Sequence, residues 1–299
     1  MTKTLVVLVG PTGVGKTKLA LHIANHIASP ILNADSRQIF KEIPIGTAAP
    51  TAEQQAIAKH FFVGNHQLTD YYSAALYEQD ALLLLDKLFL SHSRVLLSGG
   101  SMLYIDAVTK GIDDIPTVDD TTRERMKQRL KDEGLPALVE ELKRKDPEHY
   151  AIVDRNNPRR VVHALEICEM TGQTYTSFRK NNVKQRPFNI LKIGLNRPRE
   201  ELYERINQRV LDMVANGLID EAKRVFPMRN LNSLNTVGYK ELFEHFDGKI
   251  SLEEAIRRIQ SNTRRYMRKQ LTWFKRDPEI HWFHPDDEQQ ILQLIDSQT

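Results

Sequence analysis

The 299-residue chain is long enough for about two compact units, and its net charge is only +3 at pH 7. Hydrophobic residues make up 40% and charged residues 27%, a balance that excludes a disordered or fibrous protein. The single cysteine, Cys168, excludes a disulfide framework and a cysteine-based zinc site, and no apolar run approaches the ~20 residues of a membrane span. We therefore expect a cytoplasmic protein that does not enter a membrane.

The first third of the chain alternates short apolar runs with amphipathic stretches. Buried strands are predicted over Leu5–Val9, Pro30–Ala34 and Arg94–Ser98, with helices over Thr17–Ile27 and Tyr72–Ser91. This alternation indicates an α/β fold with a doubly wound parallel sheet, whose ligands bind beyond the carboxyl ends of the strands. The stretch Ala49–Asn65 shows no pattern that assigns it to an element.

From about Thr117 the character of the chain changes, because three amphipathic helices follow one another with no strand between them, at 121–130, 138–144 and 159–170. The run Phe188–Leu195 is again typical of a strand, and helical patterns then continue almost to Arg276, with breaks near Phe226 and Asp247. We therefore predict a core domain of residues 1–116 and 187–299 with a helical C-terminal region, and a helical insertion domain of residues 117–186.

A glycine-rich segment follows the first strand directly and precedes the first helix. It fits the pattern G-x-x-x-x-G-K-[ST] of a P-loop, and a strand before it and a helix after it are the structural context that a P-loop requires. The segment consists of Gly10, Pro11, Thr12, Gly13, Val14, Gly15, Lys16 and Thr17. Backbone N–H groups and the charge of Lys16 would hold a diphosphate or triphosphate, and the hydroxyl of Thr17 would bind Mg²⁺. The motif predicts a P-loop NTPase-like core without saying what is attached to the phosphates.

Carboxylates near the phosphate site bear on the type of reaction. P-loop hydrolases hold Mg²⁺ with an aspartate at the end of a second apolar strand, but here the strand Arg94–Ser98 runs into Gly99-Gly100. The acid at a strand end is instead Asp35, which could orient or deprotonate an incoming nucleophile.

The stretch from Ala255 to Arg276 holds eight basic residues and no acidic one. On a helical projection of this stretch, the apolar residues fall on one side and the basic residues fall on the opposite side, which is uniformly positive. Such a helix suits the phosphate backbone of a nucleic acid, and binding would depend on salt.

Several motifs, in order along nearly the whole chain, resemble those of the tRNA dimethylallyltransferase (tRNA isopentenyltransferase) family. Besides the P-loop, they are Asp35–Phe40 running to Ala48, Ser98–Tyr104, Asn156–Glu166, Val237–Lys240 and Arg268–Phe274. The turn that usually reads Gly-Gly-Thr-Gly-Leu-Tyr has Ser101 and Met102 in place of its Thr-Gly, and Arg159 and His163 stand where family members often carry Gln and Arg.

This resemblance implies transfer of a dimethylallyl group from dimethylallyl diphosphate to N6 of the adenosine 3′ of the anticodon, in tRNAs that read codons beginning with U. It implies that pyrophosphate is released, that Mg²⁺ is the cofactor, and that the enzyme binds the anticodon stem-loop. We expect the protein to be a monomer. The residues implied in catalysis are Asp35 as the base, with Lys16, Thr17, Arg205 and Arg209 at the diphosphate. The residues implied in tRNA contact are Asp35, Ser36, Arg37, Gln38, Ser101, Arg123, Arg159, Arg160, Val161, Val162 and His163.

Two other functions remain open at this point. A P-loop small-molecule kinase would transfer the γ-phosphoryl group of ATP, and the helical insertion would then be its lid. A non-catalytic RNA-binding protein would use a nucleotide as a switch. The basic C-terminal stretch argues against the kinase, and Asp35 beside the phosphate site argues against passive binding.

Overall fold

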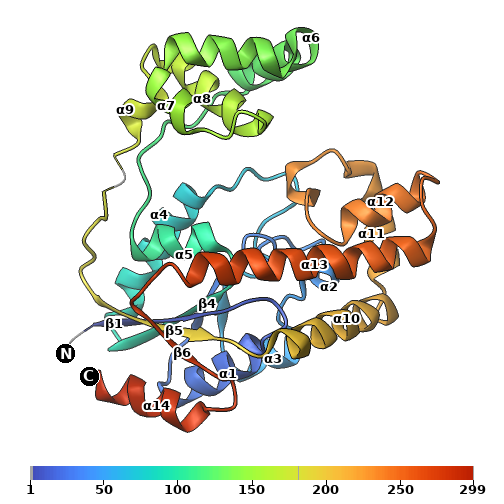
Figure 1. Ribbon diagram of the computed structural model, residues 1–299. Helices are drawn as coiled ribbons and strands as arrows, with labels where there is room; N and C mark the ends of the chain where they lie inside the picture. Colours follow the sequence, from blue (N-terminus) through green and yellow to red (C-terminus); the bar gives the residue numbers. More distant parts are fainter. Residues whose placement is uncertain (1–2, 181, 299) are drawn as a thin grey trace. The chain divides into compact units, whose positions relative to one another are not determined.

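The computed structural model describes residues 3–180 and 182–298, and its centre is a sheet of six strands (Figure 1). The strand order is β3-β2-β4-β1-β5-β6, and every neighbouring pair is parallel. The strands are β1 (Thr4–Val9), β2 (Ile31–Ala34), β3 (His60–Phe61), β4 (Arg94–Gly99), β5 (Asn189–Leu195) and β6 (Ile280–Phe283). Because all strands run the same way, the loops after β1, β2 and β4 meet at one edge of the sheet.

The central strand β1 is buried along its whole length, which explains its unbroken run of apolar residues. It pairs with β4 on one side and with β5 on the other. Thr4 lies opposite both Arg94 and Asn189, so the strand in the middle of the sheet joins segments that are far apart in the sequence.

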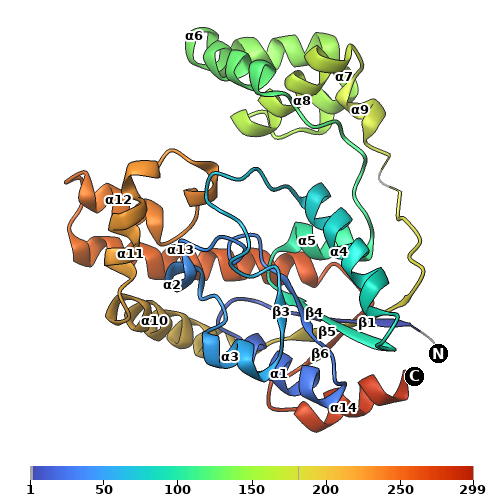
Figure 2. The same ribbon diagram turned by 180° about the vertical axis from the view of Figure 1, so that it is seen from behind.

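Helices cover both faces of the sheet, as Figures 1 and 2 show. On one face Val6 and Leu8 pack into a core shared with α1 (Lys16–His26) and α14 (Glu288–Ser297). On the other face Leu5 and Val7 pack against α4 (Ala74–Leu88) and α5 (Met102–Thr109). This arrangement confirms the predicted doubly wound α/β architecture.

A third apolar cluster joins the helices that follow β5 to the loop after β2, where Ile39 and Ile43 are fully buried. The elements that contribute are α10 (Arg199–Ala215), α11 (Leu218–Val225), the 3₁₀ turns Phe226–Met228 and Asn232–Leu234, α12 (Tyr239–Phe246) and α13 (Leu252–Phe274). The predicted C-terminal helical region is therefore present, with a further break at Gly217, whose φ of 98° ends α10 and begins α11.

Residues Gly111–Lys184 form a second compact unit with a core of its own, built around Met126, Leu138 and Val161. Its helices are α6 (Asp120–Lys145), α7 (Pro147–Ile152), α8 (Pro158–Thr171) and α9 (Tyr175–Phe178). The first is bent at Gly134, where φ is 79°, so the two predicted helical stretches lie on either side of one bend. The unit boundaries fall at 110/111 and 184/185, close to the 116/117 and 186/187 of the sequence analysis.

Short elements account for the other differences from the sequence-based expectation. The unassigned stretch Ala49–Asn65 contains α3 (Ala52–Ile57) and the two-residue strand β3, and the short helix α2 (Pro44–Thr47) comes just before it. The edge strand β6 was also not predicted, because it carries only Ile280, His281, Trp282 and Phe283 between polar loops. Within the residues that the structure describes, no helix combines the length and the apolar character needed to cross a membrane.

Candidate active site

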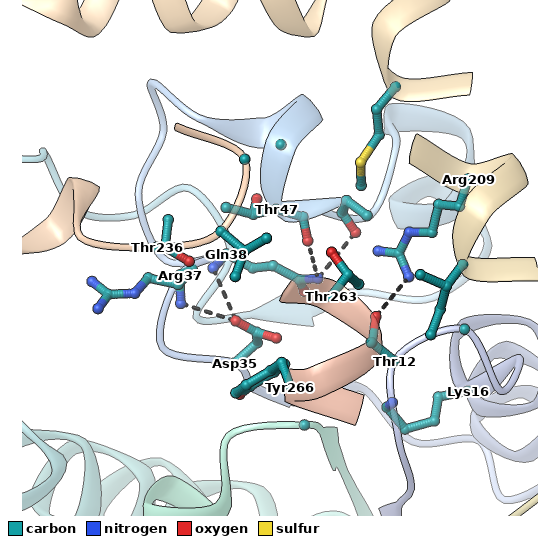
Figure 3. Close-up of a pocket in the computed structure, with 18 of the residues that line it drawn as sticks. Thr12, Lys16, Asp35, Arg37, Gln38, Thr47, Arg209, Thr236, Thr263 and Tyr266 are labelled. Atoms are coloured by element: carbon teal, nitrogen blue, oxygen red, sulfur yellow. Dashed lines mark hydrogen bonds between the residues drawn. The ribbon is translucent and has the colours of Figure 1, made fainter. Parts of the chain in front are cut away.

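A cavity of about 1150 Å³ opens where β1, β2 and β4 end, and α10 and α13 form its far walls (Figure 3). The P-loop contributes Thr12 and Lys16, the loop after β2 contributes Asp35, and the helices contribute Arg209 and Tyr266. The topology of a parallel sheet places ligands at this edge, so the cavity lies where the sequence analysis expected it.

The backbone of the P-loop needs glycine at three of its positions. The φ values of Gly10, Gly13 and Gly15 are 151°, 84° and 109°, all in the region that disfavours residues with a side chain. Between Gly13 and Gly15 the side chain of Val14 is fully buried in the core under α1, which anchors the loop. Thr17 lies in the first turn of α1 and lines the cavity with its hydroxyl-bearing side chain.

Cationic side chains surround the P-loop, and one of them, Arg197, donates from Nε to the carbonyl of Val14 (3.0 Å). Lys16 Nζ donates to the carbonyl oxygens of Gly10 (2.8 Å) and Pro11 (2.9 Å). Arg209 Nη1 donates to Thr12 Oγ1 (3.2 Å), and Arg205 Nε donates to the carbonyl of Gly13 (2.7 Å). The two arginines come from successive turns of α10, so one helix supplies both predicted diphosphate contacts.

Burial lowers the pKa values of two basic side chains at this site. Burial and the charge of Arg209 lower the pKa of Lys16, Asp35 partly opposes them, and the result is a pKa of about 7. Burial also lowers the pKa of Arg209, again opposed by Asp35. An anion held between them would restore the charged form of the lysine, so this end of the cavity is built for a phosphate ligand.

Asp35 lies at the other end of the cavity, immediately after β2. Its Oδ1 accepts hydrogen bonds from the backbone N–H groups of Arg37 (2.9 Å) and Gln38 (3.4 Å). Its Oδ2 has no hydrogen-bond partner among residues 3–180 and 182–298. One oxygen thus orients the carboxylate, and the second can accept a proton from a ligand in the cavity.

The segment after Asp35 is fixed by its neighbours. The hydroxyl of Ser101 accepts the N–H of Ser36 (2.8 Å), and the Gln38 amide donates to the carbonyls of Thr47 and Ala48 (both 3.0 Å). The predicted tRNA-contact residues of the core, 35–38 and 101, are therefore joined by hydrogen bonds into one group that lines the cavity.

Gln270 is a further site residue, and the sequence alone did not reveal it because its position falls on the apolar side of the basic helix. Gln270 is 2% exposed; its Oε1 accepts the N–H of Thr12 (2.9 Å) and its Nε2 donates to the carbonyl of Gly100 (2.8 Å). It joins the P-loop to the turn after β4. A polar residue within an apolar stripe was the signal, because a buried amide must find partners.

The prediction of a uniformly positive face on α13 is wrong for the first turns of the helix. Arg257 bonds Glu254 (2.7 and 2.8 Å), and Arg258 bonds Glu254 (2.6 Å) and Glu244 (2.9 Å). These acids lie outside the window 255–276, so a count within that window overlooked them. Arg265 and Lys269 line the cavity and form no ion pair among the described residues.

The remaining residues implied in tRNA contact lie in the second unit. Arg159 and Arg160 are exposed at the start of α8, whose N-cap is Asn157 and whose C-cap is Gly172. His163 lies beside Glu166 (3.3 Å), and Arg123 lies in the first turn of α6. Val161 is fully buried in the core of this unit, so its side chain contributes packing, and Val162 packs partly against the same core.

The fold and the cavity define a class: an α/β P-loop protein in which the phosphate site shares one cavity with a strand-end carboxylate and a basic helix. Comparison with known proteins is more specific. The sequence profile described as IPP transferase matches residues 38–277. The chain is 60% identical over 297 residues, 99% of each chain, to tRNA dimethylallyltransferase 1 of Phocaeicola vulgatus, and 59% identical over 293 residues, 98% of this chain and 97% of the other, to that of Bacteroides fragilis.

Solved structures agree with this comparison. The tRNA isopentenylpyrophosphate transferase of Bacillus halodurans superposes with a TM-score of 0.72 at 34% identity, covering 99% of this chain and 96% of the other. A eukaryotic dimethylallyltransferase acting on tRNA has the same fold, with a TM-score of 0.77 at 22% identity over 95% of this chain and 74% of the other. The chain belongs to the IPP transferase family, whose curated relatives carry the name tRNA dimethylallyltransferase.

Proposed function

We propose that this protein transfers the dimethylallyl group of dimethylallyl diphosphate to N6 of the adenosine 3′ of the anticodon, in tRNAs that read codons beginning with U. The observation that carries the proposal is the single cavity in which the cations of the P-loop end face Asp35. One end suits a diphosphate and the other suits an amine that must lose a proton. Relatives that match almost the entire chain carry the corresponding name.

The reaction assigns a role to each end of the cavity. The adenine amine attacks C1 of the dimethylallyl group, a C1–N6 bond forms, and the bond between C1 and the diphosphate oxygen breaks. Asp35 takes the proton that N6 loses. Lys16, Arg205 and Arg209 stabilise the negative charge that develops on the departing pyrophosphate. The adenine must leave the base stack for its N6 to reach the cavity.

Mg²⁺ fits this site only together with the diphosphate. No group of three or more His, Cys, Asp or Glu side chains able to hold a metal occurs within the part of the chain that is described. The Thr17 hydroxyl lines the cavity and would ligate the ion, with diphosphate oxygens and water as its other ligands. When bound, Mg²⁺ would supply positive charge to the leaving group.

The kinase is less well supported than the transferase. Ser98 and Gly99 occupy the strand end where a P-loop kinase or hydrolase places a Mg²⁺-binding carboxylate. The acid in the cavity, Asp35, follows a different strand and is placed to meet a nucleophile.

The remaining partners follow from a tRNA substrate. We assign the anticodon stem-loop to residues 35–38 and 101 of the core and to Arg123 and residues 159–163 of the insertion domain. We expect the enzyme to act as a monomer in the cytoplasm, where its substrate is found.

Incubation of the protein with Mg²⁺, unmodified tRNA and radiolabelled dimethylallyl diphosphate tests the proposal, with ATP hydrolysis followed in parallel. We expect label in the tRNA and intact ATP. ATP turnover with unlabelled tRNA would support the kinase or the nucleotide switch instead.

Replacing the base tests the assignment of Asp35. Asp35→Asn keeps an acceptor for the N–H groups of Arg37 and Gln38 but cannot take the proton, so we expect kcat to fall by about 10²–10⁴. Donor affinity should stay within about twofold, because Asp35 lies at the far end from the diphosphate. Single-turnover kinetics and a donor-binding titration measure the two quantities, and near-normal turnover would refute the assignment.

A further inference from the structure

Glu221 of α11 is a carboxylate with no exposed surface. Its oxygens contact the backbone of a turn that lines the active-site cavity. Oε2 accepts the N–H of Ile45 (2.9 Å), and Oε1 accepts the N–H of Gly46 (2.8 Å) and the hydroxyl of Tyr239 (2.6 Å). A buried carboxylate is costly unless hydrogen-bonded, and here three donors meet it. Their geometry ties the carboxylate to the short turn α2.

The turn held by Glu221 belongs to the cavity. Gly46, Thr47 and Ala48 line it, and the carbonyls of Thr47 and Ala48 accept both hydrogen bonds of the Gln38 amide (3.0 Å each). The Gln38 N–H in turn contacts Asp35. A continuous chain of contacts therefore runs from Glu221 through the turn to the residues at the acceptor end.

Tyr239 connects the same carboxylate to a second part of the wall. Its ring is fully buried, and it begins α12 directly after Val237 and Gly238, which line the cavity. A methyl group at Gly46 would overlap the Tyr239 hydroxyl, so the turn and the ring are fitted to each other without spare room.

We propose that Glu221 is a positioning residue for the acceptor: with Tyr239, it holds the turn 44–48 so that Gln38 and Asp35 keep the geometry that receives the tRNA base. The inference rests on the proposed transferase function and adds a residue that touches neither substrate. Glu221 accepts its hydrogen bonds from Ile45, Gly46 and Tyr239, and none of these donors belongs to the P-loop or to the cations around it. The donor end should therefore be unaffected by its loss.

The test separates the two substrates. In Glu221→Gln, an NH₂ group replaces one of the two carboxylate oxygens. This group cannot accept the backbone N–H that the oxygen accepted, so the turn loses a hydrogen bond and two donors repel each other. We expect the KM for tRNA to rise about tenfold, while the Kd for dimethylallyl diphosphate and the donor KM stay within about twofold. Tyr239→Phe keeps the ring and removes one bond, and we expect a rise of about threefold.

Glu78→Gln is the matched control, because Glu78 is also a buried carboxylate, is bonded to Arg186 (2.7 Å), and does not line the cavity. It should lower the thermal stability without changing the KM for tRNA. An unchanged KM for tRNA in a folded Glu221→Gln, or an equal rise in Glu78→Gln, would overturn the inference. If Glu221→Gln does not fold, Tyr239→Phe decides, and a wild-type KM there overturns it. Failure of the wild-type protein to label tRNA would instead refute the proposed function.

Discussion

Lys16 and Arg209 are two basic side chains at the same end of the cavity, and this has a consequence for the pH dependence of ligand binding. The pKa of Lys16 is lowered to about 7 by burial and by Arg209, and a bound diphosphate raises it again. Below about pH 7 the lysine is charged with or without the ligand, whereas above it binding must recruit a proton.

We therefore expect the affinity for inorganic pyrophosphate to fall as the pH rises from about 7 through roughly two units. Calorimetry in buffers of different ionisation enthalpy should show proton uptake on binding. Lys16→Arg, which remains charged throughout, should bind without uptake. The same uptake in that variant would contradict the assignment to Lys16.

Gln270 holds the P-loop by a direct bond to the backbone of Thr12, and the effect of removing it should appear at the donor end. In Gln270→Leu the N–H of Thr12 and the carbonyl of Gly100 both lose their partner. We expect the donor Kd to rise about tenfold with little change in the KM for tRNA, which is the reverse of the outcome expected for Glu221→Gln. Gln260→Leu on the same helix is the control, since Gln260 bonds the carbonyl of Asn207 and does not line the cavity.

At the scale of elements, α13 has two kinds of basic residue. Arg257 and Arg258 are neutralised by neighbouring acids, whereas Arg265 and Lys269 line the cavity. We expect Arg265→Ala or Lys269→Ala to weaken tRNA binding and to reduce the slope of log K against log salt by about 1. Arg257→Ala should leave the slope near the wild-type value. Filter binding over a salt series checks this, and equal slopes for the two groups would contradict it.

Elements with a strong local pattern were predictable, and those defined by tertiary contacts were not. The strand β1, the P-loop and α8 carry apolar runs, glycines or caps that act within a few residues. The strand β3 exists only because His60 and Phe61 pair with β2, so no local signal marks it. Element boundaries and short edge strands are settled by packing, which a single sequence does not show.

At the scale of the whole molecule, the same distinction holds for the site. Lys16, Thr17 and Asp35 are recognisable because each stands at the end of a predicted strand or in a motif. Gln270 lies 258 positions from Thr12, so its role depends on the folded arrangement alone. Glu221 likewise becomes meaningful only when α11 is placed against the turn 44–48.

The second unit interrupts the chain between the two strands that flank β1, and this order matters while the protein is being made. On the ribosome β4 emerges early, but β5 follows only after all of Gly111–Lys184 has been synthesised. Until then the edge of β1 that will pair with Asn189–Leu195 remains open, although five of its six residues are apolar. The inserted unit has its own core and can fold before β5 is available to complete the sheet. The nascent chain therefore carries a hydrophobic strand edge that a chaperone would have to shield until β5 arrives.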